Sequence, residues 1–261
     1  LFCCPGYCQR AINVDQEYAR QYEELYQRHW WWRCRESVIL RVLERMSREE
    51  SLPGDRQILD VGCGNGLFFD KLQRFGNVAG IEPDEQLVDP DGPHAGQIHT
   101  GFLDASYHPP QPLDWILMLD VLEHMDQPAE ALRHARQLLR PGGKLVVTVP
   151  AFMLLWTQHD EWNQHRTRYR RRPLVELVEE QGFQVELSRY FFHWPFFAKL
   201  LIRGIEWLIP GTPAPARVPL GFVNMACRFF TTADEWLYRW AQLPFGTSIL
   251  LVATASGESE E

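Results

Sequence analysis

The chain has 261 residues, of which 45% are apolar, and it contains 18 glycines and 18 prolines. This length and composition indicate one large domain, or one domain with a sizeable insertion, and they exclude disordered, collagen-like and coiled-coil proteins. The net charge of −8 at pH 7 argues against a nucleic-acid partner, so we predict none.

The cysteines do not predict a disulfide framework, because six in a chain of this length are too few for one. We therefore expect a cytoplasmic protein. Cys34, Cys63 and Cys227 are predicted to be small core residues. The remaining cysteines cluster at positions 3, 4 and 8, but no second pair or histidine with zinc-like spacing follows, so no metal site is predicted.

In chain order, apolar residues spaced by three to four predict a helix over 15–48, closed by Pro53-Gly54. Strands and helices then alternate. Strands are expected at 57–61, 78–81, 98–103, 115–119, 144–149, 183–187 and 248–253, and helices ending at Leu72, over 129–139 and over 173–182. This alternation predicts an α/β fold with a doubly wound, seven-stranded, mostly parallel sheet. We expect an N-terminal helical cap (1–53), a cofactor domain (54–190 and 247–256) and a helical, aromatic insert (191–246).

A glycine-rich loop follows the first predicted strand, in the pattern Asp60-x-Gly62-x-Gly64-x-Gly66. Dinucleotide-binding loops have the third glycine one residue later, which disfavours an NAD-dependent oxidoreductase. A carboxylate at the strand end repels pyrophosphate but suits the amino group and sulfonium of S-adenosylmethionine, whose carboxylate can use free backbone N–H groups. Glu82, which ends the next strand, can accept both ribose hydroxyls.

These motifs resemble those of class I S-adenosylmethionine-dependent methyltransferases of the small-molecule type-11 and type-12 branch. The sequence segments that carry the resemblance include residues 58–66, Glu82, Leu119-Asp120-Val121-Leu122-Glu123-His124 and 139–145. The resemblance implies that Asp60, Gly62, Cys63, Gly64 and Gly66 hold the methionine end of the cofactor, and Glu82 with Pro83 the ribose. It also implies that Asp104 meets the adenine amino group, with Phe102 or Leu103 against the ring, and that Leu119 and Asp120 line the floor near the methyl group.

The acceptor side is predicted from two further elements, His29-Trp30-Trp31-Trp32-Arg33-Cys34-Arg35 and the segment 159–169. Both resemble a bacterial subset of this branch with an H-D-x4-H-x-R-R-Y signature, in which Thr167 here replaces the first arginine of the pair. His159, Asp160 and His165 are candidates for a general base, and the alternative is that the histidines tie a lid loop to the sheet. His124, Arg166, Arg168 and Tyr169 are predicted to contact the acceptor. For the arginines the alternative is a solvated face, and for Tyr169 it is packing at the rim of the site.

The segment 191–209 predicts an amphipathic helix. Lys199, Arg203 and Glu206 share one face, and apolar residues form the other. This helix either covers the acceptor pocket as a lid or contacts a membrane surface peripherally. Nine of the ten tryptophans lie outside the predicted cofactor half, which favours an apolar or lipid-like substrate.

The sequence as a whole therefore predicts a methyltransferase that acts on an oxygen of a small-molecule or lipid/glycan-linked acceptor and releases S-adenosylhomocysteine. The alternative is a catalytically weak binding or scaffold protein with the same fold.

Overall fold

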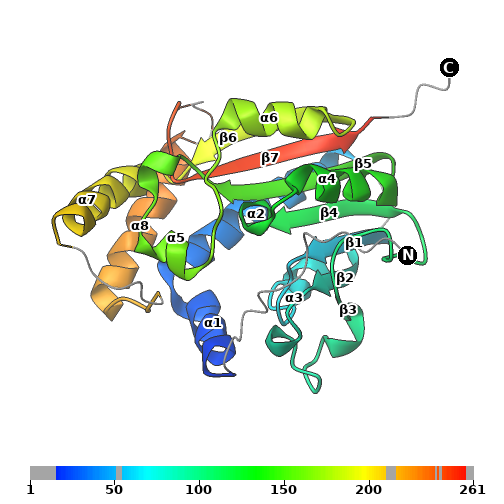
Figure 1. Ribbon diagram of the computed structural model, residues 1–261, viewed down its shortest axis with the longest axis horizontal. Coiled ribbons are helices and arrows are strands. Elements are labelled where there is room, and N and C mark those ends of the chain that lie inside the picture. Colours follow the sequence, from blue (N-terminus) through cyan, green and yellow to red (C-terminus); the bar gives the residue numbers. More distant parts are fainter. Residues whose placement is uncertain (1–15, 51–54, 210–215, 239, 241–242, 257–261) are drawn as a thin grey trace.

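A computed structural model describes residues 16–50, 55–209, 216–238, 240 and 243–256. Its centre is a seven-stranded sheet in the order β3-β2-β1-β4-β5-β7-β6 (Figure 1). The strands are β1 (Arg56–Val61), β2 (Gly76–Glu82), β3 (Ile98–Thr100), β4 (Leu113–Leu119), β5 (Leu139–Pro150), β6 (Phe183–Phe191) and β7 (Ser248–Ala255). Only β7 runs antiparallel to its neighbours, β5 and β6. The predicted fold class is confirmed.

Helices cover both faces of the sheet, because its central strands are apolar on both sides. On one face, α4 (Pro128–Leu138) and α6 (Arg171–Glu179) pack through Leu132, Ala135, Leu174 and Val178. On the other face lie α2 (Trp30–Glu49) and the short α3 (Phe69–Leu72). Trp115 in β4 is fully buried in this second layer.

The N-terminal segment forms two helices where the sequence predicts one. Helix α1 (Gln16–Arg28) ends just before His29, and α2 begins at Trp30. His29 has extended backbone angles, and its Nδ1 accepts a hydrogen bond from the Trp31 N–H at 3.1 Å. The imidazole therefore caps α2 as a new helix. Helix α1 packs against α2 and reaches the 3₁₀ turn η1 (Glu85–Leu87), which follows β2.

Short turns and one short helix follow the carboxyl ends of the strands. They are η2 (Ala95–Gln97), η3 (Leu122–His124), η4 (Met153–Leu155) and α5 (Gln158–Trp162). An isolated bridge pairs Ala151 with Tyr169, so the segment after α5 returns to the sheet edge where β5 ends.

The insert between β6 and β7 forms two helices, α7 (Trp194–Leu208) and α8 (Gly221–Tyr238), which project from one end of the sheet beside α5 (Figure 1). Its first residues belong to the core, since Phe191 ends β6 and Phe192 and His193 are buried. Asp234 on α8 accepts hydrogen bonds from the backbone N–H groups of His193 and Trp194. These bonds fix the start of α7 to α8.

Candidate functional site

The carboxylates predicted to bind the cofactor lie at the carboxyl ends of the neighbouring strands β1 and β2. Asp60 is only 4% exposed, and among the described residues no hydrogen bond or ion pair reaches its carboxylate. Burial, opposed by Arg35 and reinforced by Glu82, raises the pKa of Asp60 to about 7. A buried carboxylate in this state gains from a cationic ligand.

The glycine loop adopts the left-handed backbone that its sequence predicts, with φ of 71°, 54° and 70° at Gly62, Gly64 and Gly66. The N–H groups of Gly62, Cys63, Gly64 and Gly66 already have acceptors, so within residues 62–66 only that of Asn65 has none among the described residues. Those of Gly62 and Cys63 donate to the Ile81 carbonyl, and that of Gly66 donates to the Cys63 carbonyl. The Cys63 side chain packs towards Gly80 on β2, so its thiol supports the loop from behind.

Glu82 ties this loop to β2. Its two carboxylate oxygens accept the N–H groups of Gly64, at 2.8 Å, and of Asp84, at 3.0 Å. Each oxygen keeps a second lone pair for a ligand hydroxyl. Beyond β3, Phe102 and Asp104 are exposed whereas Leu103 is buried, so Phe102 is the better candidate to cover a flat ring. Pro83 is exposed at the start of the next turn.

Arg35 on α2 is the site residue to which sequence reasoning gives no role. Its Nε lies 2.6 Å from Oδ2 of Asp120, and its NH2 group donates to the Thr148 hydroxyl at 3.1 Å. Asp120 directly follows β4 and has a positive φ of 58°, which turns it to this partner. The sequence did contain a signal for this role, because Arg35 belongs to the tryptophan-rich element at residues 29–35, which was predicted to lie on the acceptor side. However, only the tertiary structure places that helix over the end of β4.

Tyr22 on α1 lies near the same charges. Its pKa is raised, first by desolvation and then by Asp120 and Glu82, while Arg35 acts against them. Its ring packs edge-on against Trp32 of α2. The N-terminal helices thus border the predicted cofactor site together with Leu119 and Asp120 at the end of β4.

On the acceptor side, Asp160 is a fully buried anchor. Nε and NH2 of Arg168 donate to its two oxygens at 2.7 and 3.0 Å, and the Thr157 N–H and His165 Nδ1 approach at 2.9 and 2.8 Å. Burial alone raises the pKa of Asp160, but His165, Lys199 and Arg168 together hold it well below its usual range. Asp160 therefore stays ionised and cannot reach an acceptor, which corrects its prediction as a base.

Arg168 and His159 also face the protein. Arg168, 5% exposed, donates to the Ala151 carbonyl as well as to Asp160, so it is a structural partner and not an anion clamp. His159 lies next to Asn163, with Nε2 2.9 Å from the side-chain nitrogen. Burial and then the charge of Lys199 lower its pKa to about 4.

Arg166 and Tyr169, predicted to contact the acceptor, fasten the segment after α5 to η3. The Arg166 N–H donates to the Glu123 carbonyl at 2.7 Å, and its guanidinium donates to the His124 carbonyl and pairs with Asp126. The Tyr169 hydroxyl donates to the Leu122 carbonyl at 3.0 Å.

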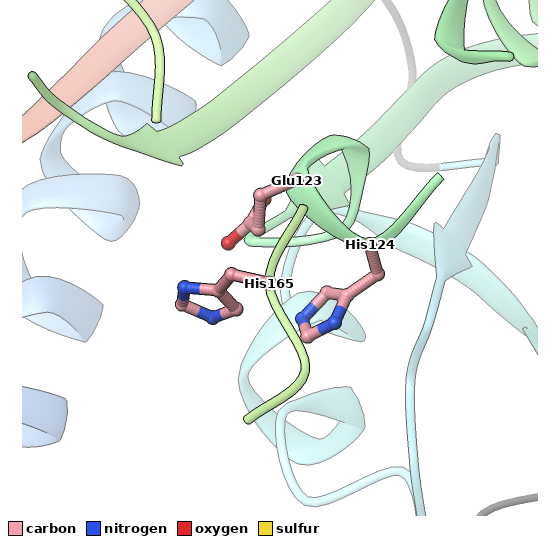
Figure 2. Close-up of side chains that lie close together, drawn as sticks. All are labelled: Glu123, His124 and His165. Atoms are coloured by element: carbon pink, nitrogen blue, oxygen red, sulfur yellow. The ribbon is translucent and has the colours of Figure 1, made fainter. Parts of the chain in front are cut away.

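This fastening brings His165 beside Glu123 and His124, which come from η3 (Figure 2). The His124 and His165 rings meet edge-on, with centroids 4.9 Å apart. Nδ1 of His165 thus contacts Asp160, whereas Nε2 points away from that carboxylate.

Comparison with known proteins identifies the family. The sequence profile of a family described as a methyltransferase domain matches residues 31–188, which is more than half of the chain. The chain belongs to this family.

Curated relatives of this methyltransferase domain are named ubiquinone biosynthesis O-methyltransferase. The one from Coxiella burnetii is 29% identical over 145 residues, which cover 51% of this chain and 61% of the relative. The one from Xylella fastidiosa is 35% identical over 127 residues, covering 43% and 50%. The chain therefore matches only about half to three-fifths of the length of these relatives.

A solved structure confirms the fold. An S-adenosylmethionine-dependent methyltransferase from Archaeoglobus fulgidus superposes with a TM-score of 0.53 at 18% identity, covering 91% of this chain and 99% of that one. Family and fold indicate S-adenosylmethionine as the cofactor of the methyltransferase domain. The residues present fit this molecule, because Asp60 is a buried carboxylate without a cationic partner in the described part of the chain.

Proposed function

We propose that the chain is an S-adenosylmethionine-dependent methyltransferase that acts on a hydroxyl oxygen of a small-molecule or lipid/glycan-linked acceptor. The observation that carries this proposal is the buried Asp60 carboxylate at the end of β1, which the cofactor's amino group would neutralise. The names of the curated relatives support oxygen as the acceptor atom.

When bound, the cofactor supplies an activated methyl group, and transfer leaves S-adenosylhomocysteine. In this proposal Asp60 binds the amino group, Glu82 the ribose and Asp104 the adenine amino group. Arg35 binds the cofactor's carboxylate, because four of the five N–H groups of residues 62–66 already have acceptors. Leu119 and Asp120 form the floor. Much of the rate then comes from positioning the acceptor in line with the methyl group.

Of the three predicted catalytic residues, we retain His165 as the one that faces the acceptor. Asp160 is ionised and can only accept, so Nδ1–H of His165 donates to it and Nε2 keeps its lone pair free. Asp160 is accordingly a positioning residue for this imidazole.

The insert supports a lipid-linked acceptor, because the polar face of the amphipathic helix α7 packs against the protein and its apolar face is exposed. Its polar residues face the protein: Lys199 lies 3.7 Å from Asp160, Arg203 donates to carbonyls of η4, and Glu206 accepts the Gln158 N–H. The exposed apolar face comprises Phe197, Leu201, Ile202, Ile205, Trp207, Leu208 and Ile209 of α7 and its flank, with Phe222, Val223, Met225, Phe229, Phe230, Trp236 and Leu237 of α8.

We propose that this apolar face lies on a membrane surface. Water-exposed helices normally turn their charges outward, and exposed apolar side chains gathered on two neighbouring helices favour an interaction site. Trp207 near the end of α7 and Trp236 in the last turns of α8 are residues typical of the membrane–water interface. No helix among the described residues is long and apolar enough to span a bilayer. The predicted contact thus moves from 191–209 to the outer faces of both helices.

Turnover tests the proposed activity. The protein is incubated with S-adenosylmethionine and hydroxylated aromatic compounds, with or without a lipid tail, and S-adenosylhomocysteine release is measured. We expect release that requires an acceptor hydroxyl and is abolished by Asp60→Ala. Binding of S-adenosylhomocysteine without turnover on any acceptor would favour the scaffold interpretation.

Co-sedimentation with phospholipid vesicles tests the membrane contact. We expect Leu201→Glu combined with Trp207→Glu to lose most vesicle binding. Phe102→Glu, which changes an exposed aromatic residue near the β3 edge, should bind as the parent does. Equal recovery of all three proteins would show that the apolar face does not bind lipid.

A further inference from the structure

Three potential metal ligands converge beside the acceptor side. Glu123 and His124 end η3, and His165 follows α5, with one ligand atom from each lying within 4.8 Å of the others. Figure 2 shows the Glu123 carboxylate next to the His165 ring, with the His124 ring across the His165 backbone from them in this view. None of the contacts described above uses the Glu123 side chain.

The buried carboxylate of Glu123 is a second, independent observation that favours a cation site here. Its side chain is fully buried, and neither carboxylate oxygen has a hydrogen-bond partner. The two other acids nearby are already paired, Asp120 with Arg35 and Asp160 with Arg168. A buried carboxylate with two unpaired oxygens is costly unless it is protonated or binds a cation.

His165 is held as a metal ligand usually is. Its Nδ1 lies 2.8 Å from Oδ1 of Asp160, so Nε2 is the ring nitrogen left to bind a metal ion. Carboxylate–histidine pairs of this kind orient the first-shell imidazole in metalloproteins. Arg168 in turn holds Asp160 through both oxygens, so this support is rigid.

The two ligand segments are also locked together. Arg166 bonds to the carbonyls of Glu123 and His124, and Tyr169 bonds to that of Leu122. These contacts fix the backbone on both sides of the cluster without occupying its ligand atoms.

We propose that Glu123, His124 and His165 bind a divalent transition-metal ion. Two imidazoles and one carboxylate form the ligand set of open zinc sites. The same ligands also bind other first-row divalent ions, so they do not select one metal by themselves. Bonds of about 2.1 Å place the ligand atoms of a tetrahedral ion about 3.4 Å apart. Because the three atoms here lie up to 4.8 Å apart, binding draws the side chains together by up to about 1.4 Å. An open position remains for a further ligand.

Glu123 follows Asp120 by three residues, and Asp120 with Leu119, the last residue of β4, is predicted to form the floor beneath the methyl group. Resting on the proposed function, we infer that the open position takes the acceptor hydroxyl. A divalent cation favours the ionised, nucleophilic form of a hydroxyl group at neutral pH. His165 then contributes as a ligand and not as the general base that the sequence predicts.

Metal binding is tested without cofactor or acceptor, using Co²⁺ and Zn²⁺ alone. The metal-free protein carries serine at positions 3, 4 and 8, because the N-terminal cysteines could bind either ion. We expect one equivalent of each ion by calorimetry, and a Co²⁺ visible spectrum without thiolate charge-transfer bands. Glu123→Gln, His124→Ala and His165→Ala should each weaken binding at least about tenfold.

His108→Ala is the matched control, since this exposed histidine lies outside the cluster and should leave binding unchanged. Thermal melting verifies that each variant is folded, and Glu123→Gln keeps the size of the buried side chain. Absence of stoichiometric binding, or equal binding in all variants, would overturn the site. S-adenosylhomocysteine binding is measured separately on the same samples, so failure of the metal site and failure of the cofactor pocket are distinguishable.

Discussion

At the scale of single residues, we predict that Asp60 couples cofactor binding to pH. Its pKa of about 7 in the free protein means that it carries a proton over much of the acidic range. The ammonium group of the cofactor prefers the ionised carboxylate, so binding below this pKa requires the proton to leave.

We therefore expect the affinity for S-adenosylhomocysteine to rise as the pH increases from 5 to 7 and then to level off. Below pH 7 the loss should approach about tenfold per pH unit, because the ionised fraction falls by that factor. Calorimetry at several pH values measures it. Asp60→Asn should bind weakly with little pH dependence, and Asp55→Asn, at the start of the same strand, should follow the parent. A flat profile in the parent would contradict the assignment.

Single residues also show which parts of the candidate site can be predicted from the sequence. The positions of Asp60 and Glu82 near the carboxyl ends of β1 and β2 and the left-handed conformation of the loop glycines were predictable, because strand ends and turn glycines are encoded locally. Their roles in cofactor binding stay predictions. The roles of Arg35 and Arg168 were not predictable, since guanidinium groups look alike in sequence. Their partners, Asp120 and Asp160, are known only once the chain has folded.

At the scale of elements, α5 is a short helix anchored through Asp160, whose most buried partner is Arg168. The side chains of Arg168 and Asp160 are 3% and 0% exposed. Removing one partner of such a pair leaves the other charge buried and uncompensated.

Arg168→Met should accordingly lower the free energy of unfolding by about 3–5 kcal/mol, the usual cost of breaking a buried pair. Arg172→Met removes the exposed pair with Glu176 and should cost about 1 kcal/mol or less. Chemical denaturation of both variants gives the comparison. Similar losses in the two variants would mean that Asp160 is not the anchor of α5.

The elements themselves were largely predictable. Alternating apolar runs identified all seven strands, with ends displaced by a few residues. The break between α1 and α2 was missed, because a helix-capping histidine is rare and Trp30–Trp32 continue the apolar pattern. The exposure of the apolar face of α7 could not be predicted from the sequence either. The spacing of apolar residues defines two helix faces but does not say which one packs against the protein.

At the scale of the whole molecule, the predicted cofactor site is bordered by parts that are distant in the chain. Helix α1 reaches η1, and Arg35 of α2 contacts the end of β4. A ligand that touches these parts at once should reduce their independent motion.

We expect S-adenosylhomocysteine to slow hydrogen exchange in α1, in residues 30–36 and in the glycine loop. Exchange in α6, which packs on β6 at the far end of the sheet, should not change. Mass spectrometry of peptides with and without ligand provides the measurement. Unchanged exchange in α1 and residues 30–36 would show that the N-terminal helices do not close on the cofactor.

The pairing of Phe191 with Ser248 has a consequence for how this protein can diversify. These residues face each other in the β6–β7 ladder, so the insert leaves and re-enters the sheet at a single point. Nothing in the sheet order depends on the length or content of what lies between them. A recombination event, or a designer, can thus exchange α7 and α8 for another module at this junction. The sheet and its cofactor-side carboxylates would then be inherited intact, whereas the contacts of Lys199, Arg203 and Glu206 with α5 and η4 would have to be rebuilt.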